Sequence, residues 1–293
     1  MPPDLTPLQH DLLTWGDLER RDLPWRRTRD PWGVLVSELM LQQTQVARVA
    51  PRWLPFLDRF PTPAACAAAR VGEVVRAWAG LGFNRRAVNL HRAATACVTH
   101  HGGVLPDDLG ELLGLPGIGP YTARAVLVFA HERDIGLVDT NAGRFVARAL
   151  GGRPLSLREA QVLADANVPA GFGWAWGQTV FDLGAAVCTR RSPVCGRCPV
   201  AAHCSWARAG WPQPDPVIGS GGVSAGQAPF AGSDREGRGR LVASLRSGPV
   251  PDDPVALAIA CGWPDDRERA ARIALGLVAD GLAVSEDGLL RLP

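Results

Sequence analysis

Two carboxylates in this chain have surroundings that suit acid–base chemistry. Glu38 lies in a run that is otherwise apolar on both sides, so it should be buried in a helix. A buried carboxylate is costly unless it is paired or functional, and burial raises its pKa toward the range of a general acid. Asp139 lies in Val138-Asp139-Thr140-Asn141, where Thr140 or Asn141 can cap the next helix. One protonated and one ionised carboxyl are what N-glycosidic hydrolysis requires, by analogy with sugar hydrolases. A lone buried glutamate is more often a core residue held by an arginine.

A glycine-rich turn, Leu115-Pro116-Gly117-Ile118-Gly119-Pro120, lies between two predicted helices. Gly117 and Gly119 predict a tight hairpin, and Pro120 opens the following helix at the first-turn position that proline prefers. The N–H groups of such a hairpin and the positive end of the helix make a cradle for one phosphate. A phosphate-binding hairpin with the Asp139 carboxylate beside it indicates chemistry at a nucleic-acid sugar. The alternative is a plain helix–helix turn with Asp139 as a cap.

Four of the seven cysteines are clustered, with the spacing C-x6-C-x2-C-x5-C: Cys188, Cys195, Cys198 and Cys204. Four thiolates within seventeen residues suit a compact site that holds zinc or an iron–sulfur cluster. Zinc sites usually pair two C-x2-C hooks, and this loop has one, which favours the cluster. A disulfide framework is disfavoured because nothing marks the chain as secreted. The loop also carries three arginines, from which we expect a basic rim that contacts DNA phosphates: Arg190, Arg191 and Arg197.

Composition sets further bounds. The 293 residues allow two or three domains. The net charge of +2 is too small to indicate nucleic-acid binding by itself. The N-terminus does not resemble a signal peptide, and every long apolar stretch is broken by Asp or Arg. We therefore expect a cytoplasmic, nucleoid-associated protein of bacterial type with no membrane contact. All basic residues are arginine, which we attribute to genomic base composition, so no side-chain amine is present to form a Schiff base.

The hydrophobic pattern is helical nearly throughout and predicts an all-α fold. Short polar or Gly/Pro joints separate helices that we place at 7–21, 30–40, 47–60, 63–69, 71–79, 85–100, 107–113, 122–130, 141–150, 157–166 and 173–187. Residues 212–234, rich in Gly, Ser and Pro, predict a flexible linker. Beyond it, helices at 238–245, 254–261 and 265–280 and a hairpin at 283–292 resemble a winged-helix module spanning 235–293.

Several motifs together resemble one known family. Ser37 to Gln45, Leu23-Pro24-Trp25-Arg26, Trp78-x-Gly80-Leu81-Gly82 and the hairpin are similar, in order, to those of MutY-type adenine DNA glycosylases, in the endonuclease III-like helix-hairpin-helix superfamily. The cysteine loop looks like the [4Fe–4S] loop of that superfamily. The resemblance covers about residues 20 to 210 and implies a two-lobed core over 1–211. A six-helix lobe would span about 25–135, and a cluster lobe would combine 1–24 with 136–211.

The resemblance implies a role for each matching residue. Glu38 would protonate the departing adenine, Asp139 would stabilise the sugar cation, and Tyr121 and Asn141 would support Asp139. Arg26 would line the adenine pocket, and the four clustered cysteines would ligate the [4Fe–4S] cluster. Because such enzymes extrude their target base, Gln43 would fill the gap and Phe83 would wedge beside the opposite base. Further DNA contacts would come from Gln42, Thr44, Leu115, Gly117 and Gly119. The implied partner of this monomeric protein is double-stranded DNA with a mismatch or an oxidised base.

Two features depart from the family pattern, and two alternative functions stay open. Phe83-Asn84 replaces the usual Tyr-Tyr pair, and residues 235–293 are too short for the Nudix-like domain that inspects 8-oxoguanine. The related thymine or uracil mismatch glycosylases lack that domain and share Val-Asp-x-Asn, so they stay an alternative. In bifunctional relatives a lysine occupies the position of Tyr121, which implies a monofunctional enzyme here. A non-catalytic iron–sulfur winged-helix regulator is the second alternative.

Overall fold

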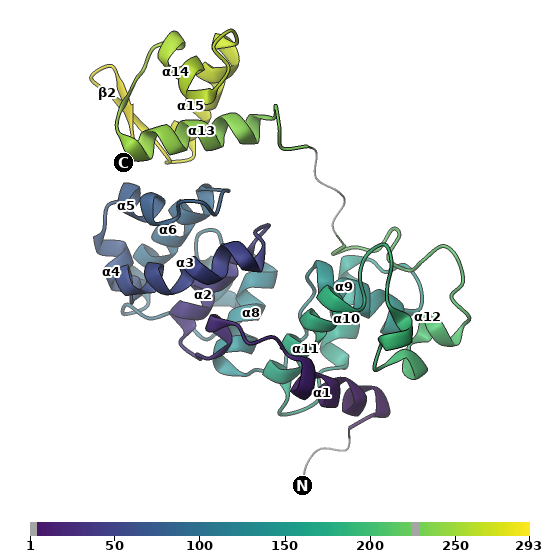
Figure 1. The fold of residues 1–293 in the computed structure, drawn as a ribbon. Coiled ribbons are helices and arrows are strands. Elements are labelled where there is room, and N and C mark those ends of the chain that lie inside the picture. Colours follow the sequence, from purple (N-terminus) through teal and green to yellow (C-terminus); the bar gives the residue numbers. More distant parts are fainter. Residues whose placement is uncertain (1–4, 224–228) are drawn as a thin grey trace. The chain divides into compact units, whose positions relative to one another are not determined.

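The computed structural model describes residues 5–223 and 229–293. Helices form nearly all of the regular structure in these residues, and the few strands form one small sheet (Figure 1). The chain divides into two compact units, Met1–Pro31 with Gly119–Gly226 and Trp32–Ile118 with Gln227–Pro293. The predicted helical fold is confirmed. Among the described residues, no helix is both long and apolar enough to cross a bilayer.

The first unit carries the N-terminal helix and the cysteine loop. Its elements are α1 (Pro7–Glu19), the 3₁₀ turn η1 (Pro24–Arg26), α8 (Pro120–His131), α9 (Thr140–Phe145), the π-helix η2 (Val146–Gly151), α10 (Leu157–Ala166), α11 (Gly173–Ala186), the 3₁₀ turns η3 (Cys195–Arg197) and η4 (Ala201–His203), and α12 (Ser205–Arg208). Helix α11 packs against α1, α8 and α9. Phe181 of α11 meets Phe129 of α8 edge to face at 5.8 Å, which ties α8 to this unit.

The second unit contains the helices between Pro31 and Gly114: α2 (Pro31–Leu41), α3 (Val46–Arg59), α4 (Pro63–Ala68), α5 (Val71–Ala77), α6 (Arg85–His100) and α7 (Leu109–Gly114). Large side chains such as Trp78 and Phe56 are fully buried at its centre, with their rings edge to face at 5.8 Å. The contact boundary falls after Ile118, so α8 belongs to the other unit rather than to the lobe predicted over 25–135. Its packing on α11 accounts for that difference.

Residues 229–293, which we call the C-terminal module, also belong to the second unit. They form α13 (Asp234–Ser247), β1 (Val250–Pro251), α14 (Pro254–Cys261), α15 (Arg267–Ala279), β2 (Val284–Glu286) and β3 (Leu289–Arg291). The strands pair antiparallel in the order β1-β3-β2, with Val284 opposite Arg291. Three helices followed by a hairpin agree with the predicted winged-helix arrangement, and the turn falls at Asp287-Gly288 as expected.

The segment predicted as a flexible linker is partly packed in the structure. Asp215 accepts from Arg148, Ser220 accepts from Leu155 N, and Gly221 N donates to Leu155 O, all within the first unit. Residues 224–228 of the predicted linker lie outside the described residues, and α13 already begins at Asp234. The helix predicted over 141–150 is also divided, since α9 gives way to π-type pairing at Val146.

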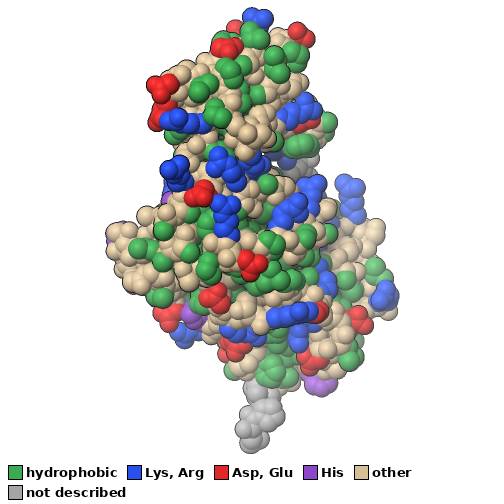
Figure 2. Space-filling model, turned by 60° about the vertical axis from the view of Figure 1, so that its left-hand side comes forward, with side chains coloured by type: hydrophobic (Ala, Val, Ile, Leu, Met, Phe, Trp, Pro, Cys, Tyr) green, Lys and Arg blue, Asp and Glu red, His purple; other side chains and the backbone are tan. Residues whose placement is uncertain are grey.

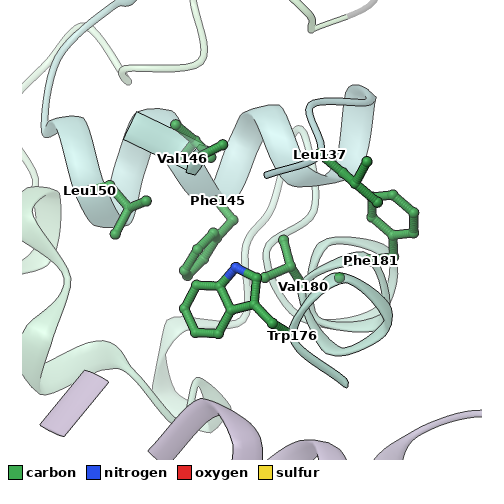
Figure 3. A pocket seen from close by; sticks show the side chains of 9 residues that line it. Leu137, Phe145, Val146, Leu150, Trp176, Val180 and Phe181 are labelled. Atoms are coloured by element: carbon green, nitrogen blue, oxygen red, sulfur yellow. The ribbon is translucent and has the colours of Figure 1, made fainter. Parts of the chain in front are cut away.

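A small void lies in the core of the first unit, between η2 and α11 (Figure 3). Its walls are apolar, with Phe145, Leu150, Trp176 and Val180 pointing into it. The volume of about 10 Å³ is roughly that needed for one water molecule. We assign this void to the hydrophobic core and not to a ligand site.

Candidate functional site

Glu38 occupies the interior of α2, as its apolar neighbours predicted. Its relative exposure is 6%, and every residue of α2 from Trp32 to Met40 is buried. The helix ends just beyond it, where Gln42 N donates to Glu38 O at 3.2 Å. A carboxyl group is therefore held inside an apolar helix one turn before an exposed loop.

One arginine that the sequence analysis did not single out holds that loop. Arg86 of α6 is buried, and its guanidinium donates to the carbonyls of Leu39 at 2.7 Å and Met40 at 2.9 Å, at the end of α2. The same group donates to Thr44 Oγ1 at 2.9 Å and to Gly82 O at 3.0 Å. Burial lowers the pKa of Arg86 to about 10, so the group stays charged at neutral pH. It satisfies helix-end carbonyls that would otherwise lack partners.

The two predicted wedge residues both have left-handed backbones. Gln43 has φ of 55° and Phe83 has φ of 44°, a region costly for residues other than glycine. Both are exposed, and Phe83 is 40% exposed although it is a large apolar side chain. Arg86 joins the two turns, because it donates to Gln42 O beside one and to Phe83 O beside the other. Thr44, predicted to contact DNA, donates its hydroxyl to Leu81 O at 3.2 Å and so links the same turns.

The hairpin between α7 and α8 has the geometry that the glycines predicted. Gly117 has φ of 78°, and a Cβ added there would lie 2.5 Å from Asn89 Cβ. Gly119 caps α8 and has open space around the position of a Cβ. Leu115, predicted to contact DNA, has its side chain in the core, so only its backbone is available. The hairpin thus needs glycine at Gly117 for packing and offers an uncovered backbone at Gly119.

We predict that Gly117→Ala lowers the free energy of unfolding by about 1–3 kcal/mol, because of its positive φ and the collision with Asn89. Gly119→Ala should change stability by less than about 1 kcal/mol, because its Cβ meets nothing. It should instead weaken DNA binding if a phosphate approaches that backbone. Urea unfolding and fluorescence anisotropy with a duplex measure the two effects. Equal loss of stability in both variants would contradict the assignment of Gly117 to packing and of Gly119 to DNA binding.

Asp139 is half-buried at the N-terminus of α9 and is itself the helix cap. Its Oδ1 accepts from the backbone N–H groups of Asn141 at 2.8 Å and Ala142 at 2.7 Å. Its Oδ2 accepts from the Asn141 amide at 3.1 Å. The expectation that Thr140 or Asn141 caps the helix was therefore wrong. Burial raises the pKa of Asp139, although its hydrogen bonds and the nearby Arg144 act in the opposite direction.

Arg144 fixes Asn141 in turn and connects it to the cysteine loop. Its guanidinium donates to Asn141 Oδ1 at 2.6 Å, to Gly184 O at 2.5 Å and to Cys188 O at 2.8 Å. A Cβ at Gly184 would lie 2.7 Å from that of Asn141, so α11 packs directly against this residue. The predicted support of Asp139 by Asn141 is thus present as a hydrogen bond. Arg144 was missed although Asn141 is only three residues away, because its other partners Gly184 and Cys188 are 40 and 44 residues distant in the sequence.

The other two side chains expected near Asp139 have identified neighbours in the first unit. The ring of Tyr121 lies 6.3 Å from that of Phe181. Arg26 is buried in a two-point ion pair with Asp182, at 2.6 and 3.0 Å, and Arg21 also reaches that aspartate. These arginines hold the pKa of Asp182 below its usual range despite its burial. The roles of Tyr121 and Arg26 toward adenine stay predictions.

The four clustered cysteines line one cavity in the first unit. Its other walls are largely apolar and include Leu183, Val187, Val200 and Trp206. Arg148 donates to Cys188 Sγ at 3.4 Å and to Thr189 O at 2.7 Å, and Asp215 anchors its other side. Within the described part of the chain, no three His, Cys, Asp or Glu side chains are grouped to hold a single metal ion. Four thiols around a largely apolar cavity fit a cluster that needs four sulfur ligands.

Comparisons with known proteins identify the family of this chain. Residues 36–164 match the HhH-GPD superfamily of base excision DNA repair proteins. An adenine DNA glycosylase of Mycolicibacterium smegmatis is 43% identical over 276 residues, covering 93% of this chain and 91% of the relative. The chain belongs to the adenine DNA glycosylase family. This glycosylase also matches the iron–sulfur binding domain of endonuclease III over residues 188–204, and it carries a [4Fe–4S] cluster. It is a DNA glycosylase of base excision repair, as the motifs predicted.

Relatives with another named activity are also similar to this glycosylase. The thymine/uracil-DNA glycosylase of Pyrobaculum aerophilum is 35% identical over 207 residues, covering 68% of this chain and 90% of the relative. A solved structure of a thermostable thymine-DNA glycosylase has a TM-score of 0.63 at 28% identity, covering 68% of this chain and 94% of that one. The similarity to this solved structure confirms the predicted helical fold.

Proposed function

We propose that this glycosylase removes adenine mispaired with 8-oxoguanine or guanine. The observation that carries the proposal is the pair of carboxylates at the family's positions, Glu38 buried within α2 and Asp139 half-buried at the start of α9. The base is suggested by the M. smegmatis relative, an adenine DNA glycosylase to which this chain is similar over nearly its full length.

The chemistry assigned to each residue follows from this arrangement. Glu38 gives its proton to N7 of adenine, and the C1′–N9 bond breaks with its electron pair going to the base. Asp139 stabilises the positive charge that develops on the sugar, and water then adds at C1′ while its proton passes to a carboxylate. Asn141 and Arg144 hold Asp139 in one orientation throughout. The four cysteines would hold the [4Fe–4S] cluster, which ties the loop together when bound.

The same residues support hydrolysis without strand cleavage. Lyase chemistry needs an amine that forms a Schiff base with the sugar. The chain has no lysine, and its only tyrosine, Tyr121, stands where bifunctional relatives carry one. Water is then the final nucleophile, and the product is an abasic site in an intact strand.

The proposed enzyme binds duplex DNA as a monomer. Gln43 and Phe83 would enter the helix, the hairpin at Gly119 would hold a phosphate, and the exposed arginines of the cysteine loop would contact others. Gln42 lies next to the wedge and would contact the DNA beside it. Binding of this kind weakens steeply with salt because counterions are released from the phosphates.

A thymine or uracil glycosylase acting opposite guanine is the second candidate. It is favoured by the similarity to the P. aerophilum enzyme and by Phe83-Asn84, which differs from the tyrosine pair of adenine glycosylases. The Gln42-Gln43-Thr44 segment favours adenine. A regulator without catalysis has less support, because it has no need of a carboxylate at Asp139 held by three hydrogen bonds.

A single-turnover assay on four duplexes separates the two enzymes. The duplexes carry adenine opposite 8-oxoguanine, adenine opposite guanine, thymine opposite guanine and uracil opposite guanine. We expect adenine release, with strand breakage only after hot alkali. Glu38→Gln should lower the rate by about 10²–10⁴-fold because the proton donor is lost, while duplex affinity stays within about threefold. Thymine or uracil release with adenine untouched would assign the protein to the second candidate.

A further inference from the structure

The C-terminal module is seated on α5 and α6 by specific contacts within the second unit. Arg246 of α13 donates to Val75 O at 3.1 Å and to Asn84 Oδ1 at 2.7 Å. Gly72 N donates to the carbonyl of Pro293 at 2.8 Å, and a Cβ at Gly72 would lie 2.4 Å from that oxygen. These contacts place the module next to the turn that carries Phe83.

Asn84 is one of the two residues that depart from the family's tyrosine pair, and in the structure its side chain has a specific partner. Its side chain accepts a hydrogen bond from Arg246. Partial burial lowers the pKa of Arg246. A tyrosine in place of Asn84 would not offer the amide oxygen that accepts from Arg246. The departure at Asn84 and the presence of the module are therefore connected by one hydrogen bond.

A basic cleft of about 1020 Å³ opens between the module and the wedge residues. One wall is formed by Gln43, the turn from Gly80 to Arg86 and the first turn of α3, and the other by one face of α13. Arginine side chains gather on this side of the molecule (Figure 2). Six arginines line the cleft against one aspartate: Arg48, Arg85, Arg86, Arg235, Arg238 and Arg246, with Asp280.

Arginines outnumber carboxylates among the residues that line the cleft. Asp280 faces Arg85 at 3.5 Å and is also paired with Arg238, so one carboxylate serves two guanidinium groups. A concave surface with an excess of arginine attracts a polyanion, and its low-dielectric walls strengthen that attraction. Because Gln43 and Phe83 lie on the same surface, a polyanion bound there adjoins the position at which the DNA helix is opened.

We propose that this cleft binds the sugar–phosphate backbone of the DNA strand opposite the extruded nucleotide, so that the module is a second DNA-binding element. The inference rests on the proposed function, in which Phe83 stands beside the opposite base. The strand that carries that base must leave the wedge along the adjoining surface, which is the wall formed by Gly80 to Arg86. Arginines from α13 then contact its phosphates from the other side.

Gly239 provides a sharp test, because it lines the cleft from the middle of α13 and nothing lies within 4 Å of an added Cβ. Gly239→Glu adds a negative charge one helical turn from Arg235, and Gly239→Gln adds the same bulk without charge. Both should fold at least as well as the parent, because glycine is a poor helix former. The matched pair therefore isolates charge in the cleft from shape and stability.

We would measure duplex affinity by fluorescence anisotropy at several salt concentrations, with Asp139→Asn present in every protein to prevent turnover. The Glu variant should bind about tenfold more weakly than the Gln variant, and each lost phosphate contact should reduce the salt slope by about 0.9. Arg272→Ala, an exposed charge loss on α15 outside the cleft, should leave both quantities unchanged. Equal affinity of the Glu and Gln variants would overturn the proposal.

Neutral methylphosphonate linkages beside the mismatch identify the strand. On the opposite strand they should reduce the tenfold difference between the Glu and Gln variants to less than about twofold, because the partner charge is gone. On the target strand they should leave the difference intact, and the reverse pattern would overturn the strand assignment. A protein that released thymine instead of adenine would fail the four-duplex assay and still show these binding differences, so the two failures are distinguishable.

Discussion

Asp139→Asn is expected to lower base release by at least about 10²–10³-fold and at the same time to stabilise the protein at neutral pH. The rate falls because a neutral amide cannot stabilise the developing sugar cation. Stability rises because Asn is as good a helix cap as Asp and carries no charge that is desolvated on folding. Asp139 is thus a residue whose function costs stability.

The pH dependence of this gain follows from the direction of the pKa shift. Burial raises the pKa of Asp139 above its ordinary value of 3.8, so the folded state binds the proton more tightly than the unfolded state does. The contribution of Asp139 to stability is complete below pH 3.8 and is lost as the pH rises through the folded-state pKa. The stability difference between Asp139→Asn and the parent should therefore be largest at neutral pH and shrink as the solution is acidified.

Unfolding in urea between about pH 5 and pH 8 measures this difference. Asp108→Asn is the matched control, because Asp108 caps α7 with bonds to Gly110 N and Glu111 N but is exposed. It should change the free energy of unfolding by less than about 0.5 kcal/mol at any pH. A stability gain in Asp139→Asn that does not vary with pH would show that charge burial is not its cause.

Local sequence signals were sufficient for most helix boundaries. The predicted bounds of α6, α10 and α14 coincide with the structure, and α10 and α14 each have a clear start signal. Ser156 and Glu159 form a capping box at α10, and Asp253 caps α14 just before Pro254. These interactions lie within four residues of one another, so the pattern that encodes them is visible in the sequence.

The supporting residues could not be predicted because their partners are far apart in the chain. Asp182 meets Arg26 from 156 residues away, and Arg86 reaches Leu39 from 47 residues away. The linker prediction for 212–234 did not anticipate packing for a similar reason, since Asp215 is held by Arg148 across 67 residues. Burial of Glu38 was predicted correctly because its neighbours alone imply it. The partners of Asp139 on its own helix were only partly foreseen, because the cap was assigned to the wrong residue.

Arg86→Lys is expected to affect base extrusion more than DNA binding. One nitrogen of Arg86 serves the end of α2, through Leu39 O and Met40 O, and the other serves Thr44 and Gly82. A lysine ammonium keeps the charge but has three donors at one point, so it cannot hold both turns. Leaving buried carbonyls without a donor should cost about 1–3 kcal/mol of stability. The backbones of Gln43 and Phe83 would then be free to leave the left-handed region.

Loss of that geometry should slow base release by about 10²-fold, as expected when a positioning contact is displaced by about 1 Å. The specific readout is 2-aminopurine at the target position, whose fluorescence rises when it leaves the stack. We expect a smaller rise with Arg86→Lys, at a duplex affinity within about threefold of the parent. Arg76→Lys, an exposed change on α5, should alter neither signal. A residue that positions Gln43 and Phe83 must alter base extrusion when its hydrogen bonds are lost. An unchanged 2-aminopurine signal in Arg86→Lys, together with reduced stability, would therefore restrict Arg86 to a role in folding.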